Sequence, residues 1–294
     1  MLNQQKKDNS EKIGSNFAPF FKEYCYICSK NRINISKELY KTDKKPIMEY
    51  PFKPIDREVF PRTFLKDVRM VVLYPEVELS KIDIGKWSSF FSQFKGVEVN
   101  IEKIKDGIEL TSEDESIKLR FSLGFVEVLL RTPSYKTFDL AIQFLSVLNG
   151  YFDAMNIKTA NKLIISKYNE LRFQQPSAEY TIQKIMKGVY SEALMQKVLS
   201  GKEVLKSLTR WEKELKFDNS DETDTLFTIE CGFSRKGVEG LNGILALTTR
   251  VETSHNSFAI EKLIEKAVAY NNILDSAFRW CVRDEIIEKM REKA

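Results

Sequence analysis

Few residue types that perform chemistry occur together in this sequence. Cys25 and Cys28 have the CxxC spacing of zinc ligands and of redox-active thiols. A zinc site needs two more ligands, but Cys231 and Cys281 stand singly in a predicted strand and helix, and His255 is the only histidine. A redox pair would open a helix that follows a strand, and no such pattern surrounds this segment. We therefore expect reduced thiols, no metal site and no cofactor.

The other catalytic motifs are missing as well. His255 lies in a polar turn before the last helical segment, and the chain contains no GxSxG motif that could supply a nucleophile. It also contains neither of the glycine-rich phosphate loops, GxxxxGK[ST] and GxGxxG. We interpret His255 as an exposed turn residue, with Asn256 or Ser257 capping the helix. The sequence favours a protein that is not an enzyme, although dispersed carboxylates or a lysine could act without leaving a motif.

Three polar or flexible clusters allow two interpretations each. Acidic residues gather at 113–115 and 218–224, where they could bind a metal ion or serve as solvated charges of polar turns. Glycines between Gly232 and Gly243 could form a loop that touches a ligand or a long hairpin connection. We favour solvated turns and a hairpin connection.

A basic and aromatic segment is the most unusual candidate for binding. Arg62, Phe64, Lys66 and Arg69 lie at the entrance to the first predicted strand. Positive charge beside aromatic rings can bind phosphate or single-stranded nucleic acid. The same residues can fasten the N-terminal arm to the sheet, and we favour that interpretation.

Composition limits the classes of function. The chain of 294 residues has a formal charge of +4 from 46 basic and 42 acidic residues, which is unlike the one-signed field of a dedicated nucleic-acid binder. Its 43% of hydrophobic residues can form a large core. No apolar run reaches the roughly 18 residues that span a membrane, and Met1–Gly14 lacks the apolar region of a signal peptide. We expect a cytoplasmic protein without a membrane partner.

The chain divides into a polar tail with an extended, proline-containing arm (1–59) and two α+β units (60–158 and 159–294). The first unit is predicted to contain strands at 68–74, 97–104, 107–112 and 117–131, the last broken at Gly124, with helices at 84–94 and 137–155. The second is predicted to contain strands at 160–173, 210–217, 225–233 and 243–253, with helices at 178–199 and 258–290. Both units read strand, helix, strands, helix, so we expect two tandem units of antiparallel sheet covered by helices.

The last segment organises this expected architecture. Apolar residues recur with helical spacing from Phe258 to Met290 without proline or glycine. A continuous helix of this length would run roughly 45–50 Å, and Leu274 on its apolar stripe should be buried. Its far end, with Arg279, Trp280 and Arg283, is our candidate surface for a partner.

Two segments resemble a sporadically distributed family of uncharacterised bacterial proteins of about 250–290 residues. Phe60–Tyr74 is similar to the opening strand of that family, and Phe278–Glu285 is similar to its closing helix. A histidine common in that helix is replaced here by Asn271, and the family's Arg-Tyr-x-Asn appears as Ser166-Lys167-Tyr168-Asn169. The resemblance covers roughly residues 60–290. It implies a two-part α+β fold and a link to mobile elements or phage defence, and it carries no catalytic residue.

We therefore predict a non-enzymatic binding or regulatory protein that acts through a protein partner or self-association, as a defence or immunity component would. One alternative is a sensor that holds a small molecule or nucleotide between sheet and helices. Another is nucleic-acid binding through the basic and aromatic face.

Overall fold

The computed structural model describes residues 50–52, 55, 58–78, 85, 99–104, 107–132, 135, 137–174, 182–199, 210–236 and 242–292. All of them belong to the unit Pro46–Ala294, one of the two units into which the chain divides. The predictions for Cys25 and Cys28, for the N-terminal tail and for the glycines at 237 and 240 lie outside the described residues. The predicted helix at 84–94 does too, apart from Gly85.

The first half of the described chain supplies five strands and one helix: β1 (Leu65–Leu73), β2 (Val99–Ile104), β3 (Gly107–Ser112), β4 (Ile117–Ser122), β5 (Phe125–Arg131) and α3 (Phe138–Ala154). Apolar side chains alternate along the strands, so that Val68, Met70 and Val72 of β1 are all buried on one face. The predicted break at Gly124 is confirmed, because β4 and β5 pair as a hairpin around it. At Gly107 a Cβ atom would lie 1.9 Å from the carbonyl oxygen of Phe121, so the pairing of β3 with β4 requires glycine there.

The second half supplies the remaining elements. These are β6 (Thr159–Ala160), β7 (Lys162–Gln174), α4 (Ile182–Val189), α5 (Glu192–Val198), β8 (Arg210–Asn219), α6 (Ser220–Thr223), β9 (Thr225–Lys236), β10 (Asn242–Thr253), β11 (Phe258–Ala259), the 3-10 turn η2 (Ile260–Lys262), α7 (Leu263–Cys281) and α8 (Asp284–Arg291). The fold is a mixed α+β fold, as the sequence predicts.

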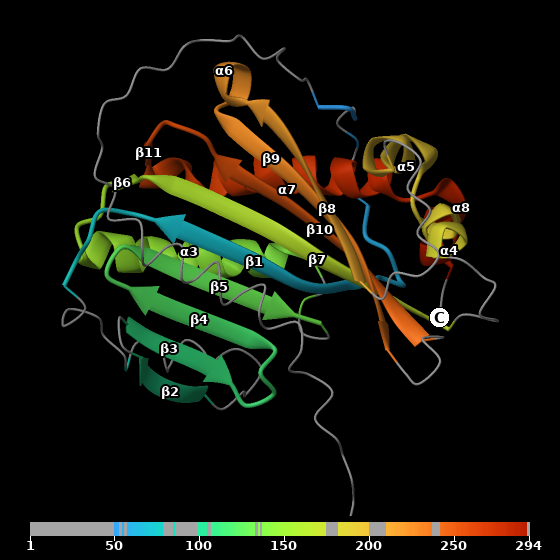
Figure 1. Ribbon diagram of the computed structural model, residues 1–294. Helices are drawn as coiled ribbons and strands as arrows, with labels where there is room; N and C mark the ends of the chain where they lie inside the picture. The colour runs from blue at the N-terminus through green and yellow to red at the C-terminus, as the bar shows by residue number, and fades with distance from the viewer. Residues whose placement is uncertain are drawn as a thin grey trace, which may run out of the picture. The chain divides into compact units, whose positions relative to one another are not determined.

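Nine strands form one continuous sheet in the order β2-β3-β4-β5-β1-β7-β10-β9-β8 (Figure 1). Each neighbouring pair is antiparallel. β1 and β7 pair at the centre, and each pairs on its other side with the last strand of a meander, β5 or β10. A separate two-stranded ladder joins β6 to β11. The sheet therefore runs without interruption from one half of the chain into the other.

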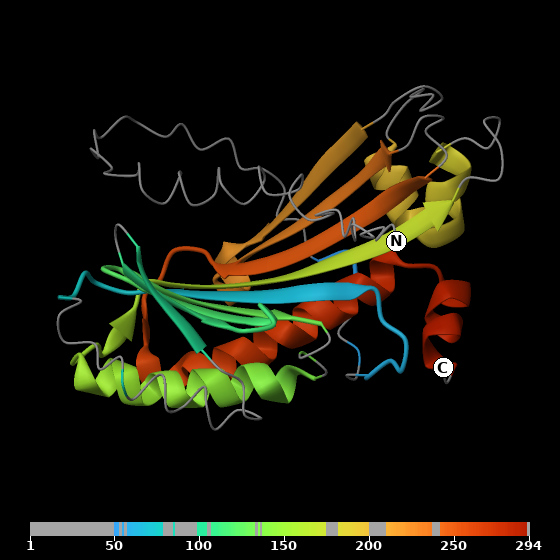
Figure 2. The same ribbon diagram turned by 90° about the horizontal axis from the view of Figure 1, so that it is seen from below.

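Helices α3 and α7 lie side by side on one face of this sheet (Figure 2). The apolar stripe predicted for the first of them is confirmed, because its members are buried in α3: Phe138, Ala141, Phe144, Leu145, Leu148 and Phe152. Leu274 of α7 is also fully buried, as predicted. The core thus fills the layer between sheet and helices.

The expectation of one helix from Phe258 to Met290 is wrong. Phe258 and Ala259 form β11, α7 ends at Cys281, and Val282 is extended before α8 begins. The single helix expected at 178–199 is likewise divided, into α4 and α5.

The two helical segments are interrupted where their backbones pair with each other. Tyr190, between α4 and α5, pairs with Val282 in an isolated antiparallel bridge. The amide of Ser191 donates to the carbonyl oxygen of Cys281 at 2.8 Å, and the amide of Arg283 donates to that of Val189 at 2.9 Å. Each interrupted helix therefore recovers its lost backbone hydrogen bonds from the other. Among the described residues, no helix is long and apolar enough to cross a membrane.

Candidate functional site

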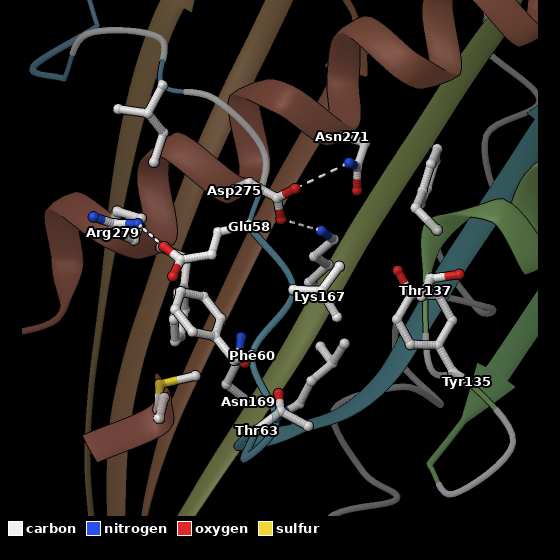
Figure 3. A pocket seen from close by; sticks show the side chains of 16 residues that line it. Glu58, Phe60, Thr63, Tyr135, Thr137, Lys167, Asn169, Asn271, Asp275 and Arg279 are labelled. Atoms are coloured by element: carbon white, nitrogen blue, oxygen red, sulfur yellow. Dashed lines mark hydrogen bonds and ion pairs between the residues drawn. The ribbon is translucent and has the colours of Figure 1, made fainter. Parts of the chain in front are cut away.

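A pocket lies where β7, α7 and the chain segment before β1 meet (Figure 3). Its volume is ≈ 100 Å³. Among the polar side chains that line it, three contact one another: Lys167 from β7, and Asn271 and Asp275 from α7. Phe60 and Phe138 supply apolar wall. The pocket is thus small and lined by both apolar and polar side chains.

Lys167 occupies a core position of the sheet. Side chains alternate along β7, so Lys167 shares the helix-covered face with the buried Leu163 and Ile165. Its strand neighbours are Val68 of β1 and Thr249 of β10. Only 7% of the residue is exposed. A lysine held this deeply needs an anionic partner, because desolvation of an ammonium group is expensive.

Asp275 supplies that partner. Its Oδ1 contacts the Nζ of Lys167 in an ion pair, and Nζ also lies 5.9 Å from the centre of the Phe138 ring. The other carboxylate oxygen, Oδ2, accepts a hydrogen bond from Nδ2 of Asn271 at 3.0 Å. Asn271 and Asp275 are four residues apart on α7 and therefore lie on the same helix face. The three side chains form one network, buried except for part of Asp275.

This network leaves one acceptor open. Asn271 is 2% exposed, and its carbonyl oxygen Oδ1 has no hydrogen-bond partner among the described residues. Because the amide nitrogen donates to Asp275, the carbonyl oxygen is directed elsewhere. A buried amide oxygen without a donor costs about 1–3 kcal/mol. The wall of the pocket therefore contains a buried acceptor without a donor among the described residues.

The segment before β1 forms one wall of the pocket and is fastened by ion pairs. The carboxylate of Glu58 contacts Arg279 of α7 at 2.6 Å and Arg291 of α8 at 2.6 and 2.8 Å. The hydrogen bond from Arg291, together with the charges of both guanidinium groups, lowers the pKa of Glu58. Further along, the amide of Arg62 donates to the carbonyl oxygen of Met290 at 3.1 Å. Helices α7 and α8 thus hold this segment in place.

The residues predicted as a basic and aromatic patch do not share one surface. Phe64 packs against the core. Arg69 lies on the sheet face away from α3 and α7, where its Nε contacts Glu127 at 2.5 Å. Arg62 contacts Glu292 at 3.5 Å, and Lys66 is exposed. The contacts of Arg62 agree with fastening of the arm, while nucleic-acid binding stays a prediction.

The residues predicted as a partner surface have internal contacts. Arg279 pairs with Glu58, and the ring of Trp280 lies 6.4 Å from that of Phe52. Arg283 is paired with Glu285 at 2.8 Å and donates to the carbonyl oxygen of Lys187 at 3.1 Å. These three residues help to attach neighbouring segments to the end of α7.

The remaining candidates have structural roles in turns or in the core. Asp224 accepts hydrogen bonds from the backbone amides of His255 and Asn256, and Asp114 accepts them from Ser112 and Ser116. Cys231 and Cys281 are buried free thiols. Within the described ranges, no three His, Cys, Asp or Glu side chains converge as a metal site requires.

Of the sequence-based candidates for binding, Arg279 lines the pocket, but the network of Lys167, Asn271 and Asp275 was not predicted. One signal was present, because Lys167 and Asn169 continue the alternating phase of Leu163 and Ile165 and so fall on the buried face of a predicted strand. Asn271 was singled out only as a position where the chain departs from the family that it resembles. Comparison of the chain with protein-family models and with curated proteins finds no match.

Proposed function

We propose that this protein is a non-enzymatic binding protein, and that the pocket between β7 and α7 receives a small hydrogen-bond donor group of its ligand or partner. The open Oδ1 of Asn271 carries this proposal. A buried acceptor without a donor calls for an explanation, and a role in binding is one. The group that satisfies it carries an N–H or O–H.

The size of the pocket favours a group over a whole metabolite. Sites for drug-sized ligands commonly enclose about 300–1,000 Å³, whereas this one has ≈ 100 Å³. A side chain, a terminal amide or a hydroxyl-bearing tip fits that space. This supports a macromolecular partner that inserts one group, ahead of a sensor that encloses a complete nucleotide.

The state of Lys167 favours binding over covalent catalysis. A lysine nucleophile must attack as the free amine. Here the ammonium group is committed to Asp275, which is itself held by Asn271. The charge of Lys167 therefore positions the carboxylate and, through it, the amide that presents Oδ1.

A matched pair of probes tests this proposal. Acetamide and acetone have similar shapes, but only acetamide has an N–H donor. The side-chain amide signal of Asn271, followed by ¹⁵N NMR, should shift on titration with acetamide and stay in place with acetone.

The same titration on variants identifies the site. Asn271→Leu should abolish the response of neighbouring backbone amides to acetamide. Asn272→Leu, at the exposed adjacent position of α7, should leave it intact. Equal responses to both probes, or no response to either, would contradict the proposal.

Two broader parts of the proposal rest on other support. We infer that the chain is built from two tandem units, because β1 and β7 each pair with the last strand of the meander that follows them, and each half ends in a helix on the same sheet face. The family resemblance supports a role in phage defence. Cells that express the wild-type protein should resist phages that plate fully on cells expressing Asn271→Leu.

A further inference from the structure

The inference concerns the edge strand β8, far from the pocket in the strand order. β8 pairs with β9 on one side, and no strand of the described chain pairs with its other side. Glu212, Lys213, Glu214 and Lys216 of this strand are exposed. Such an edge offers a row of backbone groups to any further strand.

The sequence of β8 is complementary to its own reverse. If two copies pair antiparallel with Glu214 opposite Glu214, then Glu212 lies opposite Lys216 and Trp211 lies opposite Phe217. Both of these pairs occur twice, because the arrangement has twofold symmetry. Opposite charges are among the cross-strand pairs that stabilise antiparallel sheets, and because Phe217 is already buried in its own chain, the two Glu212–Lys216 pairs carry the argument.

Contacts within the chain already hold the side chains of β8 in fixed positions. The ring of Phe217 stacks on that of Phe227 at 5.7 Å, and the ring of Trp211 lies parallel to that of Phe233 at 6.4 Å, so β9 fixes both rings on the helix-covered face. On the opposite face, Lys216 contacts Glu214 at 3.2 Å. In the paired form the two Glu214 carboxylates would lie between two lysines, which offsets their mutual repulsion.

The other edge of the sheet lacks this property. In β2, pairing about Glu102 would give no pair of opposite charges, whereas in β8 the register that puts Leu215 opposite Lys213 also pairs Glu212 with Lys216. Both edges carry charged side chains, which in many proteins prevent association. Only in β8 do the charges match in a symmetric register.

We propose that a second copy of this chain pairs with β8 in that register, which joins the two nine-stranded sheets across a twofold axis. This interface is independent of the pocket and of the function proposed for it. The alternative is that the charges of β8 only protect the edge, in which case the chain stays monomeric.

Charge exchange tests the register. Sedimentation equilibrium at low salt should show a dimer for the full-length protein. Glu212→Lys places lysine opposite Lys216 twice and should raise the dimer dissociation constant about tenfold or more. Glu212→Lys combined with Lys216→Glu restores both pairs and should return it to within about threefold of wild type. Glu102→Lys on β2 is the matched control and should change nothing.

Disulfide trapping gives a second readout in a Cys25→Ser, Cys28→Ser background. Glu214→Cys should form an interchain disulfide, because opposite residues have Cα atoms about 4.5–5.5 Å apart. Lys213→Cys should not, since its counterpart lies diagonally at about 7–8 Å. A monomeric wild type, a double exchange that fails to restore dimers, or equal trapping at both positions would overturn the proposal.

Discussion

The two halves of the sheet face their helices with different chemistry. Under α3, the strands β1, β4 and β5 present apolar side chains such as Val68, Leu119 and Val128, all nearly inaccessible to solvent. Under α7, the side chains of β7 that point toward the helix include Lys167 and Asn169. The residues of α7 that face them include Asn271 and Asp275. The α3 half is thus mostly apolar, with the buried hydroxyl pair of Tyr74 and Tyr151 as a neutral polar contact, whereas the α7 half contains an ion pair.

This difference separates stability from function. Under α3 a mostly apolar layer without an ion pair between sheet and helix supplies the packing that stabilises such a fold. A buried ion pair generally adds little stability compared with well-packed apolar residues. The polar network under α7 is therefore better understood as a site than as a support, and four measurements can challenge that interpretation.

The largest expected effect is the same in both halves. Leu145 of α3 and Leu274 of α7 are fully buried, so Leu145→Ala and Leu274→Ala should each lower the free energy of unfolding by about 2–5 kcal/mol. Chemical denaturation would measure both. A loss below about 0.5 kcal/mol for Leu274→Ala alone would mean that α7, unlike α3, is not part of the core.

The next effect belongs to the α7 half alone. Asp275→Ala leaves the ammonium group of Lys167 buried without its carboxylate and should cost about 2–3 kcal/mol, less than a fully buried pair because the Asp275 side chain is 24% exposed. The double variant Lys167→Met, Asp275→Leu removes both charges. Its stability should return to within about 1 kcal/mol of wild type. A double variant as unstable as Asp275→Ala would show that the ion pair supports the fold after all.

The stability of the β1–β7 pairing, where the two halves of the sheet meet, should depend on pH. Asp67 of β1 lies opposite Tyr168 of β7, and burial raises its pKa to about 6 from 3.8. The folded state therefore holds this proton more tightly, and the resulting stability is full below pH ~4 and lost as the pH rises through 6. In Asp67→Asn the decline in the free energy of unfolding should be smaller by about 1–2 kcal/mol. This is less than the pKa shift alone would give, because the side chain of Asp67 stays partly exposed.

Urea unfolding at several pH values would measure this decline. Asp153→Asn is the control, because the side chain of Asp153 is 76% exposed. If the free energies of unfolding of wild type and Asp67→Asn change in parallel between pH 4 and 7, Asp67 does not contribute to the pH dependence.

The smallest expected effect is the most specific. Asn271→Leu removes a buried oxygen without a donor but also the hydrogen bond from Nδ2 to Asp275, so the two effects should largely offset and leave stability within about 1 kcal/mol of wild type. Thermal unfolding would show this while the acetamide response disappears. A loss above about 2 kcal/mol would indicate that Asn271 serves packing instead of recognition.

Local patterns predicted much of the fold. Alternation located every strand of the large sheet, and Gly124 marked the break between β4 and β5. The interruptions of the helices at Tyr190 and Val282 could not be predicted in this way, because their cause is a backbone pairing between segments far apart in the sequence. The site escaped for the same reason, since Lys167 and Asp275 are 108 residues apart. The one local signal of the site was the charge of Lys167 at a position where the alternation of the strand predicts a buried side chain.

The central pairing of β1 with β7 has a consequence for how the chain folds. Val68 meets Lys167 only after the intervening part of the chain, about 100 residues, is in place. The ladder that unites the sheet is therefore its least local contact, and such contacts slow folding. During synthesis, one edge of β1 stays unpaired until β7 leaves the ribosome. In that interval a chaperone or a strand of another chain could bind the unpaired edge.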